Sequence, residues 1–343
     1  MTRRQAIGLG VAVVAALGLL WAIPLAGLVA CCVVIAVLPP WGRTYAERAI
    51  ISTVVLLGVV AITVPRASTI PITTTTAHLG LTVFILALCA LRSIPRLRTP
   101  LPRVTVSDGL VLLVAVVIIG WIWSAYLGHD QYEVLSGLYF SGWDNHGHFV
   151  PFANTVEVGA TRWPTIDGSV AWNQWYPSLH STVWSLAHLA GQHAGSSLSR
   201  PELLMPFLQW TSISFGLALA AIAWVSGDLA ARVLGVVQPW ARRWLPIARG
   251  LAIVAVGAFG ALGSPSWLFN YGFTNFVMAV AVMVVVSYLS TRSWRSARDL
   301  GWFAVPLGAL VVNGLWTPLV LGLIPAGLVV LDLQLGDMDG LDV

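Results

Sequence analysis

The stretch "GLVLLVAVVIIGWIWSAYL", residues 109–127, contains no charged side chain and is long enough to cross a lipid bilayer as one helix. Comparable apolar runs recur along the 343-residue chain, which is 57% hydrophobic and only 9% charged. A soluble domain carries about a quarter charged residues. Backbone polar groups in lipid must be satisfied within their own segment, so these runs are expected to be helices. The sequence therefore predicts an all-α, polytopic integral membrane protein.

About ten transmembrane helices are predicted, and they divide the chain into four parts. Residues 1–127 hold the N-terminal helices, 128–202 form one long connection, 203–332 hold the C-terminal helices, and 333–343 are a short tail. Pro24 separates the first two spans, because proline cannot continue a helix without a break. The spans are expected at 6–21, 23–39, 49–65, 77–92, 109–127, 203–226, 246–263, 274–290, 301–314 and 315–332.

The arginines predict how the chain is oriented in the membrane. All 18 basic residues are Arg, and with a cytoplasmic N-terminus 15 of the 18 fall on the cytoplasmic side. Only Arg66, Arg162 and Arg200 fall on the outer side. Cytoplasmic loops of membrane proteins carry an excess of basic residues. We therefore expect a multi-pass protein of the cell membrane, with a cytoplasmic N-terminus and an extracytoplasmic 128–202 connection.

The 128–202 connection concentrates the polar chemistry of the chain. Six of the seven His and six of the fourteen acidic residues lie in it, together with several Trp and Tyr. Long connections in compact proteins are usually functional or disordered, and this aromatic composition argues against disorder. We expect it to form short helices along the membrane surface and to carry any active site.

The segment "SGWDNHGHFVPF", residues 141–152, holds the strongest candidate residues. Asp144 and His148 are four residues apart and would share one face of a helix, whereas Asn145 and His146 would point elsewhere. An acid at the outer face can act as a general base on a hydroxyl group. With His180, the Asp144–His148 pair could instead hold a divalent metal. The His side chains could also contact a phosphate leaving group.

These features have structural interpretations as well. An Asp-x-x-x-His pair often occurs by chance, and Trp residues commonly form an aromatic belt at the membrane interface. Arg162 and Arg200 would contact either a lipid phosphate or the headgroup region in general. Asn270, Tyr271 and Asn275 lie in a second outer loop, "LFNYGFTNF", which either closes over a site or is a polar turn.

Three short motifs occur in order here: "GWDNHGHF" at 142–149, "VGATRWP" at 158–164 and "YPSLH" at 176–180. This order resembles membrane glycosyltransferases of the GT-C superfamily that depend on polyprenyl-phosphate sugars. A large bacterial and archaeal subset of them has Asp-x-x-x-His, then a short helix ending in Gly and Pro, then Tyr-Pro-x-x-His. Asp144 and His148 match the first motif, Gly159 and Pro164 the second, and Tyr176, Pro177 and His180 the third.

The resemblance implies a transferase that moves a sugar from a polyprenyl-phosphate donor to an envelope glycan or glycolipid acceptor at the outer face, with inversion. A divalent metal is one open possibility for a cofactor, held by the Asp144, His148 and His180 set. The bilayer is an implied partner, and a partner chain could complete the site. The candidate residues are Asp144 as catalytic base, His148, His180, Tyr176 and Arg162 for substrate or phosphate binding, and Asn145 and His146 behind them.

Two non-enzymatic functions remain open from the sequence. A transporter or flippase would need ionisable residues inside its spans, and Asp228 and Asp299 are instead predicted at cytoplasmic ends. An envelope scaffold could use the same architecture without catalysis. The net charge of +4 comes from loop arginines and does not indicate a nucleic-acid partner.

Overall fold

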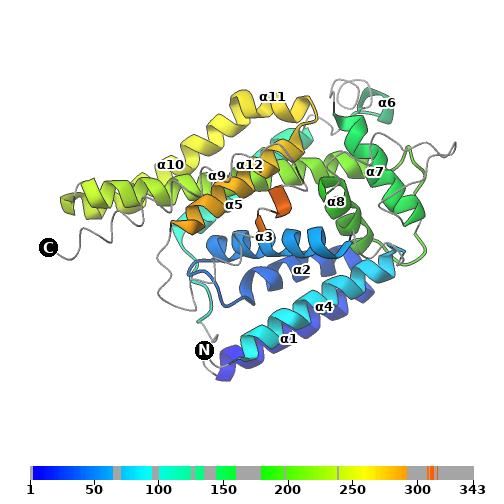
Figure 1. Ribbon diagram of the computed structural model, residues 1–343, viewed down its shortest axis with the longest axis horizontal. Coiled ribbons are helices and arrows are strands. Elements are labelled where there is room, and N and C mark those ends of the chain that lie inside the picture. The colour runs from blue at the N-terminus through cyan, green and yellow to red at the C-terminus, as the bar shows by residue number, and fades with distance from the viewer. Residues whose placement is uncertain are drawn as a thin grey trace.

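The computed structural model of the chain is a bundle of helices (Figure 1). Within the described residues no strand forms, and Thr44 and Arg103 make one isolated bridge. The all-helical prediction is therefore confirmed for this part of the chain. The structure describes residues 3–64, 71–94, 100–124, 128–134, 144–159, 179–196, 198–237, 239–291, 307–308, 310–312 and 315.

The N-terminal half begins with a tight helical hairpin. Pro24 is the first residue of its second helix, so the two apolar runs separate where the sequence predicts. Gly27 lets the second helix approach the backbone of Leu20, because a Cβ at Gly27 would overlap that backbone. Three further helices follow the hairpin. The elements are α1 (Arg3–Ala22), α2 (Pro24–Val37), α3 (Tyr45–Thr63), α4 (Thr74–Ser93) and α5 (Val106–Ser124).

The C-terminal half is organised around α9 (Leu204–Val237), whose 34 residues give a length of about 51 Å. This helix packs along α5, α10 and α12. It continues well past residue 226, where the predicted span ended. The extension is stabilised by polar partners: Asp228 forms ion pairs with Arg232 and with Arg249 of α10. The remaining elements are the 3-10 helix η5 (Pro239–Trp244), α10 (Leu245–Leu262), α11 (Ser264–Asn270) and α12 (Thr274–Ser290).

Six of the described helices are long and apolar enough to cross a membrane: α1, α3, α4, α5, α9 and α10. The helices α2 and α12 are also apolar but shorter. Each of these eight helices overlaps one of the first eight predicted spans, and six of them are long enough to cross a membrane. The predicted spans 301–314 and 315–332 lie almost entirely outside the described residues. Large apolar side chains such as Val11, Val83, Val116 and Leu251 are more than half exposed, as expected for surfaces that face lipid.

One end of the bundle is closed by buried arginines. Arg48, which is only 1% exposed, donates hydrogen bonds to the carbonyl oxygens of Val37, Gly42 and Pro100. These carbonyls belong to the end of α2 and to loops, and they would otherwise lack partners. Close contacts of Gly250 with Leu110 and of Gly227 with Arg249 place the Asp228 ion pairs at this same end. We call it the arginine end.

The opposite end holds the described part of the 128–202 connection, and we call it the site end. It contains α6 (Gln131–Val134), α7 (Asn145–Val158) and α8 (Leu179–Ala190). The start of α4 also lies here, since the Ile72 N–H donates to the Gly159 carbonyl over 2.8 Å. Figure 1 shows α7 and α8 at the right side of the bundle, and α8 packs against α4 there.

Candidate functional site

Asp144 stands at the start of α7, at the site end. Its main-chain N–H donates to the Tyr271 carbonyl over 3.1 Å, and its carbonyl accepts from the His148 N–H over 3.2 Å. Its carboxylate makes no capping hydrogen bond to the helix, and the residue is partly exposed. The backbone of Asp144 is therefore held from two sides, at a position that is partly exposed.

The turn between α11 and α12 packs against this start of α7. Gly272 has a φ of +83°, a conformation that favours glycine. A Cβ on Gly272 would lie 2.6 Å from the main-chain nitrogen of Asn145 and 3.0 Å from the Asp144 carbonyl carbon. Of the two interpretations of "LFNYGFTNF", the structure thus favours a segment that touches the candidate site. A side chain at position 272 would require the α11–α12 turn or the start of α7 to move.

His148 and His180 come together between α7 and α8. Their ring centroids are 5.0 Å apart at an interplanar angle of 65°, and the residues are 1% and 0% exposed. The sequence grouped Asp144, His148 and His180 as one possible ligand set, and the structure brings the two His rings of that set into contact. Behind this pair, Ser181 donates to the His148 carbonyl over 2.8 Å and Ser185 donates to the Phe152 carbonyl over 3.1 Å. The two helices are therefore joined by both ring packing and hydrogen bonds.

Burial keeps both imidazoles neutral. It lowers the pKa of His148 to about 4, and the nearby Asn275 side chain of α12 opposes this shift only in part. Burial, together with the neighbouring His148 ring, also lowers the pKa of His180 well below its usual value. The cause in both residues is the cost of placing a charged ring in a region without water.

The ring nitrogens of His148 and His180 are inaccessible to solvent. Direct contact of these nitrogens with a substrate phosphate, as the sequence suggested, therefore does not fit their placement. The two residues instead position α7, whose first turn carries Asp144. Asn275 extends this support, since its amide donates to the Leu315 carbonyl over 3.2 Å and its side chain is fully buried.

No three-residue metal site is assembled in the part of the chain that the structure describes. There, no group of three or more His, Cys, Asp or Glu side chains is placed to hold a metal ion. Asp144, His148 and His180 do not form such a group either. The two rings lie inside the α7–α8 interface, whereas Asp144 lies at the partly exposed start of the helix.

The structure places only some of the other predicted site residues. Asn145 is buried beneath the Gly272 turn, and His146 is exposed. Gly159 ends α7 with a φ of +72°, as the second motif predicted. Tyr176 and Arg162 lie outside the described residues, as do Pro164 and Pro177.

Arg200, which the sequence assigned either to a lipid phosphate or to the headgroup region, has protein partners. Its guanidinium donates three hydrogen bonds to the Glu157 carboxylate, at 2.5, 3.1 and 3.2 Å, and a fourth to the Asn154 side chain at 2.5 Å. Glu157 and Asn154 both lie near the end of α7. The ion pair therefore ties α7 to the loop that precedes α9.

The buried imidazoles predict a loss of stability in acid. Because the folded-state pKa of His148 lies near 4 and the unfolded value near 6.5, protons bind the unfolded chain first as the pH falls. The free energy of unfolding is therefore unaffected by His148 protonation above about pH 6.5. It falls between pH 6.5 and pH 4, by on the order of 3 kcal/mol. Thermal melting of His148→Gln should depend less on pH in this window than melting of the wild type. The exposed His193→Gln is the matched control, and equal slopes in all three proteins would contradict the prediction.

Comparison with known proteins adds no assignment to these observations. No family model matches the chain, and no curated protein and no solved structure matches it either. The functional proposal therefore rests on the three motifs and on the geometry of α7, α8 and the α11–α12 turn.

Proposed function

We propose that the protein is a membrane glycosyltransferase of the GT-C type. It takes a sugar from a polyprenyl-phosphate donor and transfers it, with inversion, to an envelope glycan or glycolipid acceptor. The observation that carries the proposal is the placement of Asp144: a partly exposed acid whose backbone is fixed by Tyr271, in front of a buried imidazole pair from the first and third motifs.

In the proposed reaction, an acceptor hydroxyl oxygen forms a bond to the anomeric carbon of the donor sugar. The bond between that carbon and the phosphate oxygen breaks, and the polyprenyl phosphate leaves with the electron pair. Asp144 removes the proton from the attacking hydroxyl as general base. Attack opposite the leaving group inverts the anomeric configuration. Arg162 and Tyr176 stay as the proposed contacts to the donor phosphate, for which a guanidinium and a phenol are suitable donors.

The proposed membrane placement follows from the two ends of the bundle. Arg48, Arg92 and Arg249 lie at the arginine end, whereas Arg200 lies at the site end. The excess of basic residues on the cytoplasmic side supports a cytoplasmic arginine end and an extracytoplasmic site end. We propose a multi-pass protein of the cell membrane with about ten spans, in which 301–314 and 315–332 are the last two.

Reconstituted protein can test this proposal directly. Purified protein in liposomes is supplied with polyprenyl-phosphate mannose, glucose, galactose or arabinose and with short envelope glycans as acceptors. We expect one donor to give a product whose new linkage has the opposite anomeric configuration, as read by NMR. A product with retained configuration would contradict the base role of Asp144. Movement of lipid-linked sugar across the bilayer without transfer would favour the transporter alternative.

A further inference from the structure

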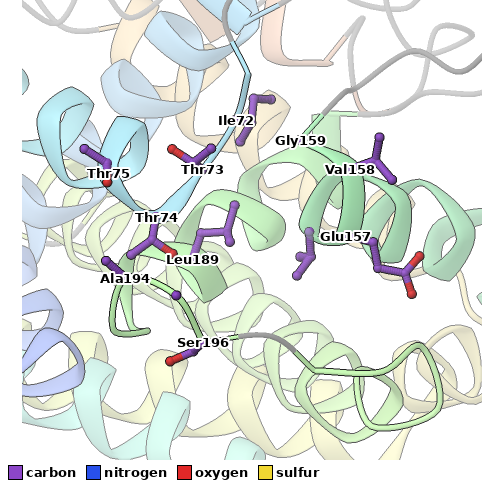
Figure 2. Close-up of a pocket in the computed structure, with 12 residues that line it drawn as sticks. Ile72, Thr73, Thr74, Thr75, Glu157, Val158, Gly159, Leu189, Ala194 and Ser196 are labelled. Atoms are coloured by element: carbon purple, nitrogen blue, oxygen red, sulfur yellow. The ribbon is translucent and has the colours of Figure 1, made fainter.

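A cavity of about 270 Å³ lies at the far end of α7 from Asp144. Its walls come from the start of α4, the last turn of α7, the end of α8 and the loop that follows α8. Figure 2 shows these segments surrounding one space, with Thr74 of α4 and Leu189 of α8 on neighbouring walls. The helix α7 has 14 residues, so the cavity is about 20 Å from Asp144.

A threonine hydroxyl group with no protein partner among the described residues lies at this cavity. Thr74 is 8% exposed and lines the cavity, and its hydroxyl forms no hydrogen bond with any residue that the structure describes. In Figure 2 its side chain points inward, towards Leu189. A hydroxyl group at the wall of a cavity can both donate a hydrogen bond to a ligand and accept one from it.

The main chain beside Thr74 adds further donors. Thr73 and Thr76 form a reciprocal capping box that satisfies their own N–H groups. The amides of Thr74 and Thr75 belong to the first turn of α4, and such amides have no acceptor within their helix. They find none elsewhere in the described chain. Three donors are therefore grouped at one wall of the cavity.

The facing wall supplies acceptors and apolar surface. The last carbonyl groups of α7, from Val156 to Val158, lie here, and terminal carbonyls of a helix need partners from outside it. The side chains of Ile72, Val156 and Leu189 are apolar. The single charged lining residue, Glu157, is ion-paired with Arg200, and its carboxylate points away from Thr74 in Figure 2.

This combination favours a neutral ligand with hydroxyl groups. An anion would be attracted by the start of α4 but repelled by the carbonyl end of α7. A sugar hydroxyl both donates and accepts, so it can satisfy the Thr74 wall and the α7 wall together. The C–H faces of a sugar ring suit the apolar side chains between them.

We propose that this cavity binds a neutral sugar residue. Taken with the proposed function, which this part of the inference rests on, the bound residue belongs to the acceptor glycan. A separation of about 20 Å from Asp144 then means that the acceptor is an extended oligosaccharide and not a single sugar.

Binding is tested without any transfer reaction. Saturation-transfer NMR is recorded on the detergent-solubilised protein with methyl mannoside, glucoside, galactoside and arabinoside, and with inorganic phosphate in competition. We expect at least one methyl glycoside to bind, and Thr74→Val to weaken it about fivefold, the effect of one lost hydrogen bond. Thr53→Val is the matched control, because the Thr53 hydroxyl is exposed and bonds within α3. Ala194→Phe, at an exposed lining position, should block binding by filling the cavity.

The outcomes separate this inference from the proposed function. Displacement by phosphate, equal binding by Thr74→Val and the wild type, or the absence of any glycoside signal would overturn the sugar site. Loss of glycoside binding in Thr74→Val and Ala194→Phe, in a protein that transfers no sugar, would support the site and contradict the transferase. If the sugar site and the transferase function are both supported, Thr74→Val should raise the KM for a long acceptor more than the KM for a short one.

Discussion

Replacing Asp144 by Asn is expected to lower the rate of sugar transfer by roughly 10²- to 10⁴-fold, the range that general-base catalysis supplies. Asn has the same shape as Asp but cannot accept the hydroxyl proton. The main-chain bonds of residue 144 to Tyr271 and His148 remain possible in the variant, so α7 should keep its start. The measurement is the initial rate of transfer in liposomes at saturating donor, beside the melting temperature of the same preparation.

The matched control for this substitution is Asp130→Asn. Asp130 is an exposed acid in the same connection, and its side chain accepts a hydrogen bond from the Glu133 N–H. We expect that variant to keep its rate within about twofold, since surface substitutions usually cost little. Full activity of Asp144→Asn, in protein that is folded and inserted, would eliminate Asp144 as the base.

Replacing Gly272 by Ala is expected to destabilise the protein by roughly 3 kcal/mol and to reduce transfer at the same time. Two costs, one from the backbone conformation and one from steric overlap, together lower the free energy of unfolding. The positive φ is unfavourable for an L-residue by about 1–2 kcal/mol. The new methyl group would also lie 2.6 Å from the Asn145 nitrogen, so the α11–α12 turn or the start of α7 must move.

Gly128→Ala separates these two terms. Gly128 has a φ of +86°, and a Cβ there would meet no heavy atom of the described chain within 4 Å. This control should show only the backbone cost in thermal melting, with little change in transfer. Equal losses of stability in the two variants would show that the turn does not press on α7. A stable Gly272→Ala variant with full transfer would contradict the positioning of Asp144 by this turn.

The fold could largely be predicted from local sequence features. The break at Pro24, the end of α7 at Gly159 and the existence of eight apolar helices follow from the chemistry of single residues and short runs. The predicted span 203–226 did not indicate that α9 continues to Val237, because apolarity alone cannot show that Asp228 pairs with Arg249 on another helix. Ion pairs between distant segments have no periodicity that marks them in the sequence.

The candidate site was predictable only in part. The spacing of Asp144 and His148 and the motif around His180 identified residues that the structure does bring together at one end of the bundle. The spacing could not show how deeply His148 and His180 are buried. Because they are buried, the two His side chains support α7 and do not contact a phosphate. Asn275 and Gly272 were visible as part of a polar loop, but nothing in that loop indicates that it meets α7.

By itself, the amino-acid sequence determined that the chain forms apolar helices, where several of them begin and end, and which polar residues are grouped. These properties depend on neighbours within one or two helical turns, through hydrophobic runs and the restricted backbone of proline and glycine. Only the tertiary structure decided that the Tyr271–Gly272 turn holds Asp144, that His148 and His180 lose water together, and that Thr74 faces a cavity. Each of these depends on contacts between segments distant in sequence, which form only when the helices pack.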